Sequence, residues 1–388
     1  MKKTLVLLLM ILILLTACNG DDRETNPPNT GNDTNGWVNT SNIEKKTDNS
    51  TEEDTNGIID DETVSPEASE NGDIVFENIL AAVNITPQDI EKLYKEQLSL
   101  ENQDEENLKS CMDYICRSLG IDEWPVRPPD RVERKQLKLN GENSYTVLEF
   151  SGASELRMLI FKQNSDGMWK FIDYIDFGGK NAGIGYSLKK LGNSIFVVGN
   201  SCKGYGTGLS IYNREWYLVS DEGKRMVLSY PFDDHSVGPY GGYMRSEKNM
   251  KLSAEGDLKL TLDFDVSRIY NLELDIADEY GQIELHAEMK AEFVWDDGKK
   301  EFSSPYPVDD SGVTNIPVES PVFTQKCDEI LDMYYDKLLE SIDAIQKEDT
   351  REWKARGINM FLEDCSDGKK KSEVLRNMEE AFPELADR

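Results

Sequence analysis

Residues 231–245 (PFDDHSVGPYGGYMR) bring together the side chains of this chain that are best suited to contact a ligand. Carboxylates, an imidazole and aromatic rings alternate there with glycine and proline. Such a mixture on a loop suits the recognition of a sugar or a peptide, because loops on rigid scaffolds often carry binding residues. A plain long turn is the simpler interpretation of the same composition. The candidate ligand-binding residues are Asp233, Asp234, His235, Tyr240 and Tyr243.

The motifs of common catalytic and metal sites are missing from the sequence. The glycines of CKGYGTGLS, residues 202–210, are not followed by Gly-Lys-Ser/Thr and a helix, so they predict a flexible connection between strands rather than a phosphate loop. His235 and His286 are the only histidines, too few for a zinc site built on histidines. No Gly-x-Ser-x-Gly elbow occurs. We therefore predict no catalytic residue, no metal site and no cofactor.

Acidic side chains recur along several expected strands, among them Asp263, Asp265, Glu284 and Glu288. Side by side on one sheet they could bind Ca²⁺, which takes about six to eight oxygen ligands, or serve as an acid/base pair. Like charges opposite one another destabilise a sheet, however, and lysines interrupt the acidic series. A solvated outer face is the preferred interpretation. An extracytoplasmic hydrolase that uses paired carboxylates remains the alternative function.

The first eighteen residues carry the clearest motif in the chain. Lys2 and Lys3 precede an apolar run, residues 5–15, that is too short to span a bilayer, which needs about 20 apolar residues. Such a run is typical of an export signal. It ends in LTAC, residues 15–18, which resembles the lipobox of bacterial lipoproteins. The resemblance implies a signal peptide over residues 1–17, a diacylglyceryl group on the Cys18 thiol, and a protein anchored at the extracytoplasmic face of the cell membrane.

Charge and cysteine content restrict the partners and the covalent structure. The net charge of −31 argues against nucleic acid and anionic lipid as partners. The expected partners are the lipid bilayer, through acylated Cys18, and an unidentified extracytoplasmic ligand or protein. Of the six cysteines, five remain beside Cys18, and an odd number cannot form a complete disulfide framework. Cys327 and Cys365, on successive expected helices, are the pair for which a bridge stays open.

The segment between the anchor and the body, residues 18–72, has the composition of a spacer. It is rich in Asn, Asp, Glu, Thr, Ser and Gly, and its few large apolar residues show no period. A segment with little apolar surface to bury and much like charge stays disordered. The sequence therefore predicts an acidic tether that holds the body away from the membrane.

Residues 73–388 have the patterns of a folded α+β body. Helical periodicity covers 73–120, where Thr86-Pro87 is a strong helix start, and returns over about 322–382. Apolar and polar residues alternate over about 135–304, between repeated turn signals. We expect a large antiparallel β region (a sheet, a sandwich or an open barrel) flanked by N- and C-terminal helices. The predicted function is that of a membrane-anchored lipoprotein that binds an envelope or extracellular ligand without catalysis.

Overall fold

The structure, a computed structural model, describes residues 85–100, 105–122, 127–140, 143–272, 282–345 and 351–383. The predicted signal peptide, the tether and an expected helix at residues 73–82 lie outside these residues. Within the described ranges, no helix has both the length and the apolar character needed to cross a membrane.

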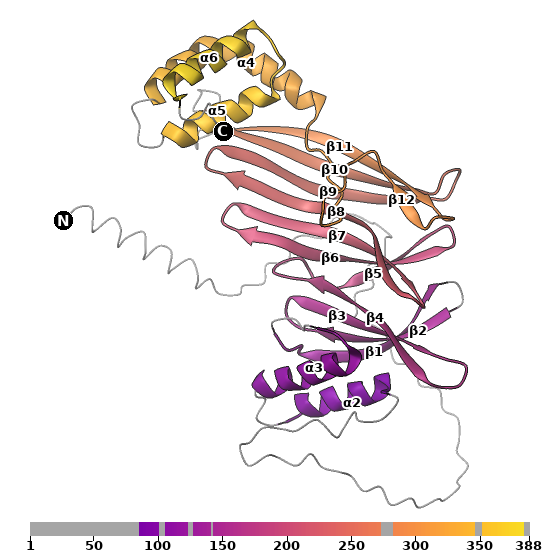
Figure 1. Ribbon diagram of the computed structural model, residues 1–388. Coiled ribbons are helices and arrows are strands. Elements are labelled where there is room, and N and C mark those ends of the chain that lie inside the picture. Colours follow the sequence, from indigo (N-terminus) through magenta and orange to yellow (C-terminus); the bar gives the residue numbers. More distant parts are fainter. Residues whose placement is uncertain are drawn as a thin grey trace, which may run out of the picture. The chain divides into compact units, whose positions relative to one another are not determined.

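A mostly antiparallel sheet of twelve strands is the centre of the fold (Figure 1). The predicted α+β class, a large antiparallel β region with helices at both ends, is confirmed, and of the three arrangements considered the chain adopts the sheet. The strand order is β1-β2-β3-β4-β6-β7-β8-β9-β10-β11-β12, and β5 pairs with β6. The strands are β1 Arg131–Asn140, β2 Asn143–Ser151, β3 Glu155–Gln163, β4 Trp169–Gly178, β5 Tyr186–Leu191, β6 Ser194–Gly206, β7 Leu209–Ser220, β8 Gly223–Gly238, β9 Gly241–Ser253, β10 Lys259–Asn271, β11 Gln282–Asp296 and β12 Glu301–Ser303.

Strand β6 joins the two halves of the sheet. It pairs antiparallel with β5 and with β7, which begins the meander that continues to β11. Single residue pairs also connect β6 to β4, through Gly178 and Ser201, and to β1, through Asn140 and Ser194. Because β1 and β4 are the two outer strands of the β1–β4 meander, that meander curls toward β6.

Helices α2 (Pro87–Leu98) and α3 (Glu105–Leu119) cover one face of the β1–β4 meander. Helix α2 begins at the predicted position because Thr86 and Asp89 form a capping box: the Thr86 side chain accepts the Asp89 amide, and the Asp89 carboxylate accepts the Thr86 amide. The ring of Tyr94 then packs edge-on against Phe150 of β2, with the centroids 5.2 Å apart.

The C-terminal helices are α4 (Pro321–Ile345), α5 (Arg351–Asp364) and α6 (Lys369–Ala381). Helix α5 packs on β10, and α4 packs on β11 (Figure 1). Close approach requires Gly357 on α5, because a Cβ at this position would lie 2.5 Å from the carbonyl oxygen of Asn271. At the end of α5, the Asp364 carboxylate accepts hydrogen bonds from Arg268 and Tyr270 of β10 at 3.1 and 2.7 Å.

Cys327 and Cys365 are both buried and both free thiols, so the bridge that the sequence left open is not formed here. The two thiols are hydrogen-bonded to each other, and Cys327 Sγ also donates to the Tyr270 hydroxyl at 3.5 Å. The pKa of Cys327 is lowered, and the hydrogen bond that it accepts from Cys365 is the largest cause.

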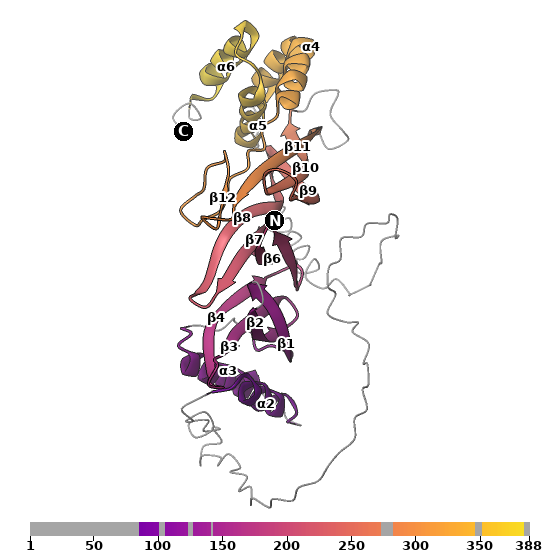
Figure 2. The ribbon, with the colours of Figure 1, turned by 90° about the vertical axis from the view of Figure 1, so that its right-hand side faces the viewer.

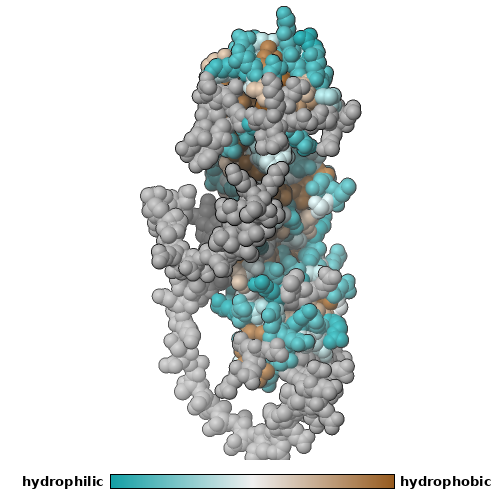
Figure 3. Space-filling model, turned by 90° about the vertical axis from the view of Figure 1, so that its left-hand side faces the viewer, coloured by the Kyte–Doolittle hydropathy of each residue, from teal (hydrophilic) through white to brown (hydrophobic). Residues whose placement is uncertain are grey.

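The acidic outer faces of β10 and β11 are neutralised by lysines. Lys248 lies 3.1 Å from both Asp265 and Glu288, and Lys259 lies 3.0 Å from Glu292. This is the solvated, lysine-interrupted face that the sequence predicts. In the part of the chain that the structure describes, no group of three acidic, histidine or cysteine residues could hold a metal ion. Hydrophilic residues dominate the coloured surface in Figure 3.

Candidate functional site

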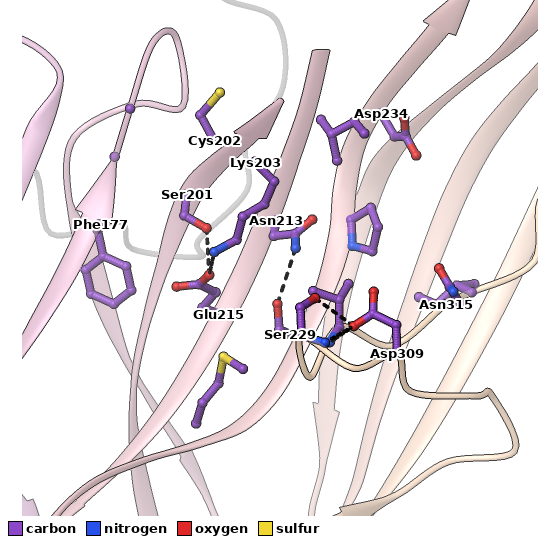
Figure 4. A pocket seen from close by; sticks show the side chains of 18 of the residues that line it. Phe177, Ser201, Cys202, Lys203, Asn213, Glu215, Ser229, Asp234, Asp309 and Asn315 are labelled. Carbon is purple, nitrogen blue, oxygen red and sulfur yellow. Dashed lines mark hydrogen bonds and ion pairs between the residues drawn. The ribbon is translucent and has the colours of Figure 1, made fainter. Parts of the chain in front are cut away.

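A cavity of about 1250 Å³ lies between the sheet and the segment that follows β12. Strands β3, β4, β6, β7, β8 and β9 contribute its floor, and residues 305–319, here called the strap, contribute the opposite wall. Figure 4 shows side chains from both walls around the cavity, and the strap is the orange segment beside β8 in Figure 2.

The strap is fixed to the sheet at two points. The Thr314 amide donates to the carbonyl of Ser229 on β8 at 2.7 Å. Arg245 of β9 donates through Nη1 to the carbonyl of Ile316, also at 2.7 Å. Thr314 and Ile316 are buried, whereas the residues between and before them are more exposed. The position of this wall therefore depends on Arg245.

A buried ion pair forms the deepest part of the site. Asp234 and Arg245 are direct partners across β8 and β9 and are only 2% and 3% exposed. Arg245 Nη2 lies 3.1 Å from Asp234 Oδ2, which also accepts the Tyr243 hydroxyl at 2.9 Å. Burial raises the pKa of Asp234, lowers that of Arg245, and raises that of Tyr243 to about 12. Among the described residues, Asp234 Oδ1 and Arg245 Nε have no hydrogen-bond partner.

A second carboxylate, Glu215 of β7, is buried and fully engaged. It accepts hydrogen bonds from Ser201 Oγ at 2.7 Å and from the Tyr217 hydroxyl at 2.9 Å, and Lys203 Nζ lies 2.6 Å away. Figure 4 shows Ser201 and Lys203 converging on this carboxylate. Burial, followed by the charge of Glu215, raises the pKa of Tyr217 far above its ordinary value. Ser201 and Lys203 are thus held by Glu215 and not by each other.

Asn213 lies beside Glu215 on the same strand and is 1% exposed. Its Nδ2 donates to the hydroxyl of Ser229 at 3.5 Å (Figure 4). Its Oδ1 is buried and has no partner among the residues that the structure describes. The cavity therefore contains a second unpartnered acceptor in addition to Asp234 Oδ1.

The aromatic rings at the other end of the cavity are already in contact with cations or with one another. The Arg157 guanidinium binds Asp176 through two hydrogen bonds of 2.5 and 2.6 Å and lies 4.7 Å from the centre of the Tyr174 ring. Lys224 Nζ lies 4.0 Å from the same ring centre. Cation–π contacts of this kind occupy the ring surface on which a ligand would otherwise stack.

The interpretation of residues 231–245 as a loop is wrong, because these residues form a β-hairpin. Strand β8 continues to Gly238 and β9 starts at Gly241, so only Pro239 and Tyr240 form the turn. The glycines that suggested a loop instead allow β8 and β9 to pair closely. A Cβ on Gly242, whose φ is +154°, would lie 1.8 Å from the carbonyl oxygen of Ser236 on the neighbouring strand.

The hairpin places the five candidate residues in three different positions. Asp234 and Tyr243 line the cavity. Asp233 and His235 are not among the lining residues and form a pair of their own, with His235 Nε2 3.2 Å from Asp233 Oδ1. Tyr240 lies at the exposed tip. Alternation along a strand explains the separation, because neighbouring side chains point to opposite faces.

Sequence reasoning missed Arg245, Glu215 and Asn213, which complete the buried part of the site. They come from two different strands, and no local motif connects them. One signal was available: Glu215 and Asn213 interrupt an otherwise largely apolar strand, IYNREWYLV, where a buried polar side chain needs a specific reason.

The glycine-rich stretch has the plain role that the sequence predicts. Gly206 ends β6 and Gly208 turns the chain into β7, so the glycine-rich stretch is a connection between strands. His286 is exposed on β11, where its Nδ1 lies 2.9 Å from the Ser267 hydroxyl.

The sequence matches no protein-family model, and no curated protein shows significant similarity to it. The cavity geometry and the N-terminal motif are therefore the features that bear on function.

Proposed function

We propose that this protein is a membrane-anchored extracytoplasmic lipoprotein that binds an envelope or extracellular ligand in the cavity between the sheet and the strap. The carrying observation is the group of buried, unpartnered polar atoms on Asp234, Arg245 and Asn213, all within one cavity of about 1250 Å³. Buried polar atoms nearly always have a hydrogen-bond partner. A ligand that enters the cavity is the partner that we propose.

The N-terminal motif is the sole support for the proposed localisation. Each buried methylene contributes roughly 0.8 kcal/mol, so a single acyl chain binds reversibly whereas the two chains on Cys18 would anchor stably. A disordered chain of the length that the sequence predicts for the tether would have a root-mean-square reach of roughly 40 Å. The cavity could therefore meet a ligand well beyond the lipid head groups.

A hydrolase that uses paired carboxylates is the second candidate, and Asp234 is the observation that favours it, because a buried carboxyl with a raised pKa can act as a general acid. The groups that act on Asp234 are Tyr243, Arg245 and His235. In a catalytic carboxyl pair the partner of Asp234 would be a second carboxylate. The groups around Asp234 include a guanidinium and a phenol, which fit a carboxylate that binds a ligand better than one that acts in such a pair. We therefore prefer binding.

Cys202 offers a direct test, because it lines the cavity and is the one cysteine of the five described that is not buried. The full chain carrying Cys18→Ser is treated with a chromogenic disulfide reagent in the presence of wall fragments, oligosaccharides or peptides. A ligand in the cavity should slow the reaction of Cys202 and raise the melting temperature, since a ligand at 100 times its Kd adds about 2.7 kcal/mol of stability.

The matched control is Cys202→Ser, which should remove the fast-reacting thiol and leave the thermal shift unchanged. A ligand that stabilises the protein without protecting Cys202 would place the binding site elsewhere and contradict the proposal.

A further inference from the structure

The basic side chains that line the cavity are all neutralised by carboxylates. Each of the four lies within 4.0 Å of an acidic partner, the longest separation being 3.7 Å. The pairs are Arg157–Asp176, Lys203–Glu215, Lys224–Asp173 and Arg245–Asp234. None of these cations is therefore left to attract an anionic ligand.

Three lining carboxylates remain without a cation: Glu155 at the start of β3, and Asp309 and Glu319 on the strap. None of them forms an ion pair with any residue in the described ranges. Asp309 accepts the amides of Ser311 and Val313 at 2.9 Å. The hydrogen bonds around it, that from the Ser311 hydroxyl foremost, lower the pKa of Asp309. The uncompensated charge of the cavity is therefore negative and is supplied from both walls.

The unpartnered buried atoms give an independent indication of the ligand. Asp234 Oδ1 and Asn213 Oδ1 are acceptors, and Arg245 Nε is a donor. An ammonium or guanidinium group offers several donors and no acceptor, so it can serve the two oxygens but not Arg245. A peptide with basic side chains offers both, because its backbone carbonyls accept hydrogen bonds.

The aromatic rings argue against an oligosaccharide. Sugars commonly lie flat on an exposed ring, yet Arg157 and Lys224 both lie against Tyr174. Phe177 is packed against Tyr217, with the ring centres 5.8 Å apart. Charge and hydrogen bonds are therefore the interactions that the cavity offers to a ligand.

We propose that the ligand of this cavity is a linear cationic peptide. This inference rests on the proposed binding function and adds the chemical class of the ligand. The net charge of −31 supports it, because a strongly acidic protein raises the local concentration of cations and speeds their encounter.

The test compares tetralysine with tetraserine, spermine and a chitin tetrasaccharide, by calorimetry on the full Cys18→Ser chain at physiological ionic strength. The test variant is Glu155→Gln/Glu319→Gln. The matched control is Glu284→Gln/Glu288→Gln, which removes the same formal charge from β11, outside the cavity. Tetralysine should bind wild type, protect Cys202 and lose about tenfold in affinity in the test variant, with less than about a twofold loss in the control.

Equal losses in the two variants would show non-specific attraction to an acidic surface and overturn the inference, as would no binding of tetralysine at all. Spermine that binds as tightly as tetralysine would overturn the peptide assignment in favour of a polyamine. Protection of Cys202 by the saccharide, with tetralysine silent, would overturn the cationic class while leaving the proposed binding function in place.

Discussion

Asp297 connects two turns that are distant in sequence. Its Oδ1 accepts hydrogen bonds from Ser194, Lys300 and Trp295 at 2.8, 2.7 and 3.1 Å. Its Oδ2 accepts one from Asn193 at 3.1 Å. These partners, Lys300 first, hold the pKa of Asp297 well below its ordinary value of 3.8. The ionised carboxylate therefore fastens the β5–β6 turn to the β11–β12 turn.

Asp297→Asn should lower the free energy of unfolding by about 1–2 kcal/mol near pH 7, a value reduced for partial exposure to solvent. Because the folded-state pKa is depressed, this contribution is present above the ordinary pKa of 3.8 and is lost as the pH falls through the lower folded value. Urea denaturation near pH 7 and near pH 3 measures the change. The difference between wild type and variant should shrink at the lower pH.

The control for this substitution is Asp257→Asn, in an exposed turn, which should change stability by less than about 0.5 kcal/mol. Equal stabilities of Asp297→Asn and wild type near pH 7 would contradict the role of Asp297.

At the scale of elements, the strap depends on the Asp234–Arg245 pair. Arg245→Met would leave the Asp234 carboxylate buried without a cation and remove the hydrogen bond to Ile316. We therefore expect the free energy of unfolding to fall by about 3–5 kcal/mol. The double variant Asp234→Asn/Arg245→Met leaves no unpaired charge, so its free energy of unfolding should fall clearly less than that of Arg245→Met. A double-mutant cycle by urea denaturation checks this, and additive losses would contradict the coupling.

Lowering the pH tests the same prediction in a second way. Burial raises the pKa of Asp234, so the folded state takes up its proton more readily than the unfolded state, and this group favours folding more as the pH falls. The difference in the free energy of unfolding between Arg245→Met and the double variant should therefore decrease toward acid pH.

Helix α5 depends on its close approach to β10. In an exposed helix, alanine is favoured over glycine by about 1 kcal/mol. At Gly357 we expect the opposite sign, a loss of about 1–3 kcal/mol for Gly357→Ala, because the new Cβ would lie 2.5 Å from the Asn271 carbonyl oxygen. Thermal denaturation of wild type and variant measures this loss of stability. Gly206→Ala, with open space around the new Cβ, is the control and should change stability by less than about 0.5 kcal/mol.

At the scale of the whole molecule, we propose that the location of the protein depends on Cys18, which precedes the described residues. Cys18→Ser removes the thiol that would carry the acyl chains, so the protein should leave the membrane fraction. Immunoblots of membrane and soluble fractions measure the distribution. Cys202→Ser should remain with the membrane, and membrane retention of Cys18→Ser would contradict the lipoprotein assignment.

The elements were predictable from the sequence wherever the deciding interactions are local. The capping box at Thr86 and Asp89 forms between residues three apart, and it starts α2 as expected. Alternation in LKLTLDFDV, residues 258–266, predicts a half-buried strand because neighbouring side chains face opposite sides. Turn chemistry around Gly298 likewise depends on a few neighbouring residues, where Asp296 accepts the Gly298 amide at 2.9 Å.

Residues 231–245 mark the limit of this reasoning. Glycine and proline favour a loop when only the chain itself is considered, but pairing with β7 and β10 extends β8 and β9 almost to the turn. The same pairing decides which candidates share a site. Asp234 meets Arg245 because the two strands are in register there, whereas Asp233, next in the sequence, points elsewhere.

The sequence by itself determined the fold class, the start of α2, the solvated, lysine-interrupted acidic face and the expectation of a lipid anchor, because each depends on composition or on residues close together in the chain. Only the tertiary structure decided the strand order, the strap and the cavity. Glu215, Asp234 and Arg245 lie on three different strands, and Ile316 lies far along the chain, so strand register and a long-range hydrogen bond bring them together.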